Sequence, residues 1–334
     1  MPNEQWDNGG PAANSGYNQG SLTATSAQAH TSVLGPRFNA IVAFFPFLEA
    51  QAVFDNFVTN NHQPWEGGSF PPGAVSILHC PSDRNTLRSG RGGGTTSMSN
   101  IALSLGDNIT VVGNTRGIAT WPFPNPLRSA STLAERRSQV NEIAGVGMDA
   151  IHDGTSNSIF CSEIVVATDQ TYMNAKGGIS QSGTFGAGGG SAIGNWTFNT
   201  SLCMSNALTD DRREVRSGQG FGGGGRGRRP LDRWINYGWV FNTLLPPNGP
   251  VCMREGAEQA GSGALTAQSF HSGGVNVGMA DGAVRFVTDS VNTNNAGGGM
   301  IQLGTSGHPA FSGPSNFGVW GAMGSINGGE SVSL

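Results

Sequence analysis

The residues of this chain that could support chemistry are few and widely separated. His271 is followed by Ser272, Gly273 and Gly274, an order that could place a nucleophile beside a glycine-rich oxyanion nest. A hydrolase of the α/β type would carry its serine in a GxSxG turn, and the sequence contains none. The same glycine-rich run is typical of the entry to a strand. We therefore expect no catalytic residue and no enzymatic activity.

Metal binding has two candidate forms in the sequence. His271 stands apart from the other five histidines, which argues against a site built from several histidine ligands. Oxygen ligands for calcium are easier to find, because acidic and asparagine side chains gather in several expected turns. These residues are Asp83 with Asn85, Asp107 with Asn108, Asp153 with Asn157, and Asp281. Calcium is thus a candidate cofactor, and turn stabilisation without a metal is the alternative.

The four cysteines are Cys80, Cys161, Cys203 and Cys252. None belongs to a CxxC pair and no histidine lies at zinc-finger spacing, so a structural zinc site is not expected. An even number of widely spaced cysteines permits one or two disulfides in an oxidising compartment. The spacing does not select a pairing.

The composition favours short strands joined by polar loops. Only 12% of the 334 residues are charged, and 53 are glycine, which permits positive φ and weakens helix interiors. The net charge of −4 argues against nucleic acid as a partner. The basic run Phe221–Arg229 is interpreted as a solvated loop, because Phe221 is its only aromatic residue. No apolar run approaches the ~20 residues that a membrane helix needs.

Two segments are predicted to be helical. Apolar residues recur at helical spacing over 37–60, and Pro46 should bend or split that helix. A second helix is predicted over 132–143. Residues 1–36 are polar, show no sustained period and are interpreted as an irregular leader.

Strands are predicted where β-prone runs end at turn signals. The predicted strands are 75–80, 99–105, 157–166 and 235–245. A hairpin is predicted over 275–287 around Asp281 and Gly282, the preferred dipeptide of a two-residue type I′ turn. With that turn, Val275, Val277 and Met279 share one buried face with Val284, Phe286 and Thr288.

At this hairpin the sequence resembles a known family. HSGGVNVGMADG, residues 271–282, is similar to the H-X9-DG motif of prepilin-type processed proteins in the DUF1559 family, also labelled solute-binding protein family 10. Five further stretches resemble family landmarks in the same order. They are PFLEAQAVFDNF (46–57), HCPSD (79–83), IHDGTSNSIFCSE (151–163), RRPLDRWINYGWVFNTLLPPNGPVC (228–252) and FGVWGAMGSINGGE (317–330).

The resemblance implies an α+β fold, a pilin-like head in which an N-terminal helix packs on an antiparallel β-sheet enlarged by long β-rich insertions. It implies a single head domain over 37–334, preceded by the leader 1–36. Family members begin with a prepilin peptidase site and a long apolar helix, and neither is in this sequence. We expect that the pilin helix has been removed, and that only this missing helix would contact a membrane.

The resemblance also implies structural roles for the motif residues. Asp281 and Gly282 would form the hairpin turn, and His271 would hydrogen-bond a neighbouring loop. Asp153, Gly154 and Asn157 would stabilise a second turn, and Cys80 and Asp83 a third. Cys203 and Cys252 lie where the family tends to carry cysteines and are the preferred disulfide pair. Cys161, at a position that is usually aliphatic, and Cys80 are expected to be free.

The function implied is that of a non-catalytic, pseudopilin-like bacterial protein located outside the cytoplasm, on the cell surface or secreted. Its role would be structural, with copies of itself or other pilin-like subunits as partners. The alternative is an extracellular module that binds a solute or glycan. In that case exposed aromatic side chains would stack on sugar rings, the candidates being Trp65, Trp196, Trp234 and Trp239.

Overall fold

The computed structural model describes most of the chain from Asn39 onward. The described residues are 39–60, 75–84, 98–109, 116–119, 146–168, 172–187, 197–216, 225–232, 235–253, 263–294, 300–302 and 313–330. They form a mixed α+β fold of short helices and mostly antiparallel sheets. The leader 1–36, the helix predicted over 132–143, and Trp65, Trp196 and Trp234 lie outside the described residues.

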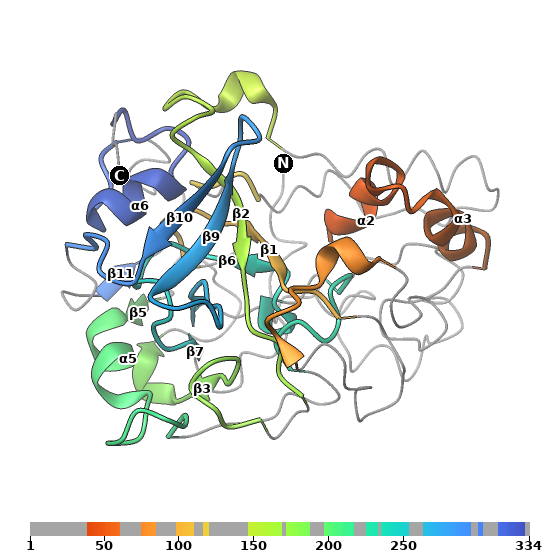
Figure 1. The fold of residues 1–334 in the computed structure, drawn as a ribbon. Helices are drawn as coiled ribbons and strands as arrows, with labels where there is room; N and C mark the ends of the chain where they lie inside the picture. The colour runs from red at the N-terminus through yellow and green to blue at the C-terminus, as the bar shows by residue number, and fades with distance from the viewer. Residues whose placement is uncertain are drawn as a thin grey trace, which may run out of the picture.

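A five-stranded sheet lies at the centre of the described part of the chain (Figure 1). Its strand order is β10-β9-β2-β1-β6. The strands are β1 (Ile101–Ser104), β2 (Ile159–Glu163), β6 (Val240–Phe241), β9 (Gly274–Met279) and β10 (Val284–Thr288). All pairs are antiparallel except β1 with β6. The segments predicted as strands over 99–105 and 157–166 are therefore strands, although shorter than predicted.

The two faces of this sheet bury different apolar side chains. On one face Val275, Val277, Met279 and Val287 pack with Trp320 of α6 (Gly318–Gly324). The core on the other face includes Leu103 and Val240 together with residues of the first helical segment, Ile41 and Phe45 among them. Figure 1 shows α6 beside β9 and β10, and the first helical segment toward the opposite side of the molecule.

The helix predicted over 37–60 is split, as the position of Pro46 suggested. It consists of α2 (Ile41–Phe44), the 3₁₀ turn η3 (Phe45–Leu48) and α3 (Gln51–Asn60). Pro46 lies in the first turn of η3, where its missing N–H is tolerated. Glu49 then adopts a left-handed conformation with φ 57° and ends the turn. Phe44 contacts Phe160 of β2, with ring centroids 5.8 Å apart.

A second core lies around a disulfide between Cys203 and Cys252. Cys203 is on α5 (Thr200–Asn206), which begins where Asn199 Oδ1 accepts the Leu202 N–H at 3.0 Å. Two small sheets complete this region, in the orders β11-β5-β4 and β3-β7-β8. Their strands are β3 (Ser180–Gln181), β4 (Gly186–Ala187), β5 (Thr197–Asn199), β7 (Cys252–Met253), β8 (Gly263–Ala264) and β11 (Met300–Gln302).

Short 3₁₀ turns occupy two places where strands were predicted. The segment 75–80 contains η4 (Ser76–Leu78), so the predicted strand is wrong. Its buried residues, Val75 and Leu78, are three apart, which matches a turn of three residues and not the alternation of a strand. Within 235–245 the structure forms η9 (Ile235–Tyr237) before β6. Two further turns are η6 (Met148–Ala150) and η7 (Gly183–Phe185).

The hairpin of β9 and β10 exists, but its loop has three residues and not two. Met279 N–H bonds Ala283 O at 2.8 Å and Gly282 N–H bonds Met279 O at 3.0 Å. Gly282 has φ 87°, whereas Asp281 is not among the described residues of positive φ, so the turn is not type I′. This is a type I turn followed by a left-handed glycine.

The extra loop residue reverses the faces of β10. Val275 faces Val287, and Val277 faces Arg285. A one-residue shift of register moves every side chain of a strand to the other face. Val287 is therefore buried, and the burial predicted for Val284, Phe286 and Thr288 is wrong, since Val284 is 74% exposed and Phe286 47%.

Within the described residues, no helix is both long enough and apolar enough to cross a lipid bilayer.

Candidate functional site

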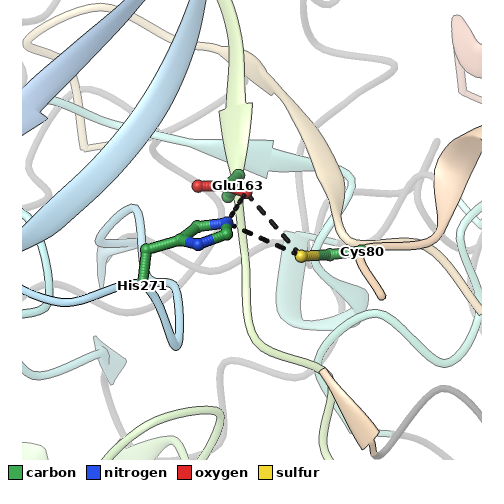
Figure 2. A group of neighbouring side chains, drawn as sticks. All are labelled: Cys80, Glu163 and His271. Atoms are coloured by element: carbon green, nitrogen blue, oxygen red, sulfur yellow. Dashed lines mark hydrogen bonds and ion pairs between the residues drawn. The ribbon is translucent and has the colours of Figure 1, made fainter. Parts of the chain in front are cut away.

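Three side chains that are far apart in sequence meet at the C-terminal end of β2. Figure 2 shows Cys80, Glu163 and His271 pointing toward one another from three separate segments. His271 Nε2 lies 2.9 Å from Glu163 Oε1. Cys80 Sγ lies 3.8 Å from each of these two atoms. The three donor atoms therefore surround a common point, and we call this group the Cys-Glu-His centre.

Cys80 is held in place by its backbone. It follows η4, and its N–H donates to Asn100 Oδ1 at 2.8 Å. Asn100 Nδ2 donates in turn to Asp83 Oδ2 at 2.7 Å and to Ile164 O at 2.9 Å. Asp83 Oδ2 also accepts the Val166 N–H at 2.9 Å. This buried network joins the turn that carries Cys80 to the segment that follows Glu163.

Glu163 is the last residue of β2 and is 8% exposed. Its Oε2 accepts the Asn276 N–H at 2.7 Å and Asn276 Nδ2 at 3.3 Å, both from neighbouring β9. These two donors fix the carboxylate and satisfy Oε2. Oε1 is then left to face His271 and Cys80.

His271 lies in the turn that leads into β9. Its N–H donates to Ser269 Oγ at 2.8 Å, and Ser269 N–H donates to Asn248 Oδ1 at 2.8 Å. The His271 side chain is 33% exposed, against 11% for Glu163. Water can therefore reach the centre from the side of the histidine.

The geometry of the centre restricts its chemistry. In a nucleophile–base–acid relay the two nitrogens of the histidine ring have different partners, one for the nucleophile and one for the carboxylate. Here Cys80 and Glu163 both approach Nε2. A sulfur, a nitrogen and a carboxylate oxygen gathered in this way are instead a set that could hold a metal ion.

A second free cysteine lies nearby but outside the centre. Cys161 is on β2, two residues before Glu163. Burial raises the pKa of the Cys161 thiol, and a backbone hydrogen bond from Gly278 opposes this only in part. A raised pKa lowers the thiolate fraction, so Cys161 is a weaker nucleophile than an ordinary cysteine.

The acidic residues proposed for calcium already bind donors of the chain. Asp153 accepts the N–H groups of Gly328 at 2.6 Å and Gly329 at 2.7 Å. Asp107 pairs with Arg116, and Asp281 accepts the Ala283 N–H at 2.9 Å. These contacts favour the turn-stabilising alternative over calcium.

The other predicted site residues are also placed in turns or in the core. Gly154 has φ 92° in the turn closed by Asn157, whose Nδ2 donates to Asp153 O at 3.0 Å. Cys203 and Cys252, the pair favoured by the family resemblance, form the disulfide, and both are fully buried. Trp239 is 3% exposed and cannot stack on a sugar.

Sequence reasoning named Cys80 and His271 separately and did not select Glu163. Glu163 ends the stretch 151–163 that supported the family resemblance, so its presence in a motif was the available signal. The sequence argument compared His271 only with the other histidines, whereas its partners among the described residues are a cysteine and a glutamate. Asn100, Asn276 and Ser269, which orient the centre, gave no signal.

Comparison with known proteins gives one kind of match. A family model described as "Protein of unknown function (DUF1559)" (SBP_bac_10) matches residues 2–294. Among curated proteins and among solved structures, nothing matches.

Proposed function

The chain belongs to the DUF1559 family, whose function is unknown, and on that premise we propose that it is an extracytoplasmic surface protein with a structural role. In this proposal it is a pseudopilin-like subunit with a pilin-like head, it is not an enzyme, and its partners are other copies of itself or related subunits.

The main observation in favour of a structural role is that buried carboxylates hydrogen-bond the backbone of distant segments. Asp153 and Asp83 are 8% and 3% exposed and accept backbone N–H groups from distant segments. Asp153 thereby joins the turn before β2 to residues more than 170 positions later. Carboxylates used in this way stabilise the fold and are not available as acids or bases.

The disulfide supports the extracytoplasmic location. Cys203 and Cys252 are both 0% exposed and join α5 to β7. Such bonds form and persist mainly in oxidising compartments outside the cytoplasm. Mass mapping without reduction, on protein taken from its native cells, should recover the Cys203–Cys252 pair. Alkylated Cys203 in that material would contradict the location.

The outer strand of the central sheet supports an assembly role. In the described part of the sheet β10 is an edge strand, and its Val284 and Phe286 are 74% and 47% exposed. Uncovered edge strands with apolar side chains are templates for pairing with another chain. A second copy is the fitting partner, because two identical edges can pair antiparallel about a twofold axis.

Sedimentation velocity over a range of concentrations tests this proposal. The wild-type chain should self-associate, and Val284→Lys should weaken the association. Ile77→Lys is the matched control, because Ile77 is 64% exposed on η4, which is not part of the sheet that contains β10. A wild-type chain that stays monomeric at all concentrations, or an Ile77→Lys variant that loses association equally, would exclude β10 as the contact.

A further inference from the structure

We propose that the Cys-Glu-His centre is a binding site for a divalent transition-metal ion of the zinc class, with Cys80 Sγ, Glu163 Oε1 and His271 Nε2 as its three protein ligands. The proposal is independent of the structural role argued above. It rests on the distances, the charges, the orienting contacts and the exposure of these three residues.

The distances between the donor atoms fit one small ion. Zinc lies ~2.0–2.3 Å from nitrogen, oxygen and sulfur ligands, which gives tetrahedral edges of roughly 3.3–3.6 Å. The edges here are 3.8, 3.8 and 2.9 Å. Side-chain shifts of about 0.5 Å would bring all three atoms to bonding distance. The approach of both partners to the same nitrogen, which does not suit a relay, is what ligands of a common ion require.

The charge and the donor types select the class of ion. A cysteine thiolate and a glutamate carboxylate carry two negative charges, which neutralise a divalent cation beside a neutral histidine. Calcium and magnesium prefer sets of oxygen ligands, whereas sulfur and imidazole nitrogen favour zinc and its neighbours. The other hydrogen-bond partners found for the Glu163 carboxylate come from Asn276, which is neutral. A cation would therefore complete the charge balance of the centre.

The surroundings hold each ligand in position before an ion arrives. Glu163 Oε2 is occupied by Asn276, the Cys80 backbone by Asn100, and the His271 backbone by Ser269. Outer contacts of this type orient metal ligands and tune their affinity. With three protein ligands and the histidine 33% exposed, a fourth position is open to water.

The test uses cobalt as a spectroscopic substitute for zinc, with the disulfide-intact chain after removal of metals by a chelator. One equivalent of Co²⁺ should produce a thiolate-to-cobalt charge-transfer band and the visible bands of a tetrahedral site, and one equivalent of Zn²⁺ should abolish them. Cys80→Ser should lose the charge-transfer band. Glu163→Gln and His271→Gln should weaken binding beyond the ~10- to 100-fold that loss of an outer contact costs.

Two control variants are matched by residue type. Cys161→Ser removes the other free thiol, and His152→Gln removes an exposed histidine whose Nδ1 lies 3.2 Å from Asn327 Oδ1. Both should bind cobalt as the wild-type chain does. A wild-type chain without the charge-transfer band, or a band that persists in Cys80→Ser, overturns the proposal.

A second measurement on the wild-type chain needs no folded variant. Zinc should slow the alkylation of Cys80 by iodoacetamide, measured by peptide mapping, and should leave the rate at Cys161 unchanged. Equal rates at Cys80 with and without zinc would refute the site even where the substitutions prevent folding.

Discussion

At the scale of single residues, Asn100 carries an unusual share of the contacts near the Cys-Glu-His centre. It is 1% exposed, and its side chain makes three hydrogen bonds, to Cys80 N, Asp83 Oδ2 and Ile164 O. These bonds connect the turn at 80–83 to the segment that follows β2. A buried amide with this many partners leaves several groups unsatisfied when it is removed.

Asn100→Ala should lower the free energy of unfolding by about 2–4 kcal/mol, because a buried N–H, a carbonyl and a carboxylate lose a partner together. Urea denaturation measures the change. Asn292→Ala is the control, because Asn292 is exposed and its side chain accepts only the Asn294 N–H at 2.8 Å among the described residues. Its cost should stay below ~1 kcal/mol. Equal decreases in the free energy of unfolding of both variants would show that the buried network around Asn100 does not stabilise the fold more than an exposed hydrogen bond does.

Arg226 is a second residue whose burial has a measurable consequence. It is 1% exposed, and Nη1 donates to Gln268 Oε1 at 3.1 Å. Nε and Nη2 are also buried, and no described residue is a hydrogen-bond partner of either atom. Burial lowers the pKa of Arg226 to about 9, well below the usual value of a guanidinium. The charged form is therefore disfavoured in the folded chain, and this penalty is fully present below about pH 9 and is lost as the pH rises above it.

Arg226→Met should therefore stabilise the chain at pH 7, by about 1–4 kcal/mol, because an apolar side chain of similar size replaces a poorly paired buried charge. The difference in stability between Arg226→Met and the wild-type chain should be smaller at pH 10 than at pH 7. Thermal unfolding at both pH values measures it. Arg216→Met, at a half-exposed side chain paired with exposed Asp210, should change stability by less than ~1 kcal/mol. A destabilised Arg226→Met variant at pH 7 would contradict this account.

At the scale of secondary-structure elements, loop length decides which face of the hairpin is buried. The three-residue loop at 280–282 pairs Val275 with Val287, so Val284 and Phe286 face outward. The loop in turn depends on the left-handed conformation of Gly282, with φ 87°. One glycine thus determines whether the edge of the sheet presents apolar side chains.

Gly282→Ala should destabilise the chain by about 1 kcal/mol, because an alanine is strained at this φ. No atom lies within 4 Å of the added Cβ, so the cost is conformational and not steric. Gly282→Asn is the matched variant, since asparagine tolerates the left-handed region, and its cost should be smaller. Chemical denaturation of the wild-type chain and the two variants measures their free energies of unfolding. An asparagine variant that is less stable than the alanine variant would contradict the prediction.

The elements predicted from sequence succeed where a pattern is long or a turn signal is strong. Apolar spacing over residues 37–60 predicted the helical segment, and Pro46 predicted its break. The strands β1 and β2 lie within β-prone runs that were predicted as strands, and β9 and β10 follow from alternation on the two sides of Asp281 and Gly282. The strand predicted over 75–80 was wrong, because a run of six residues rich in apolar side chains does not distinguish a strand from a turn. The prediction of which hairpin residues are buried was wrong for β10, because the Asp-Gly dipeptide does not determine the number of loop residues.

At the scale of the whole molecule, the disulfide closes a long loop within a second core. Cys203 and Cys252 are separated by 49 positions, and both pack among the residues of that core. Cross-links over long loops stabilise mainly by restricting the unfolded chain.

Reduction of this disulfide should lower stability by about 4 kcal/mol, the value that loop-closure entropy gives for this separation. Guanidinium denaturation with and without reductant measures it. A chain with both Cys203→Ala and Cys252→Ala is the control, because its stability should not respond to reductant. If the double variant is as stable as the oxidised wild-type chain, the bond contributes nothing to the native state.

The Cys-Glu-His centre could not be predicted from the sequence, because its residues are far apart along the chain. Its three residues are separated by 83, 108 and 191 positions. Each stood in a recognisable motif, but only the pairing of β2 with β9, and the turn held by Asn100, brings the motifs together. Local patterns specify local structure, whereas this centre depends on three long-range contacts.

The strand order of the central sheet has a consequence for the synthesis of the protein. β9 lies between β2 and β10, yet it begins about 110 residues after β2 ends. At ~5–20 residues per second, a ribosome needs roughly 6–20 s to supply it. During that interval β1 and β2 can pair while the outer side of β2 has no strand beside it. That side of β2 is therefore open to non-native strand pairing until β9 is available, and slower elongation lengthens the interval.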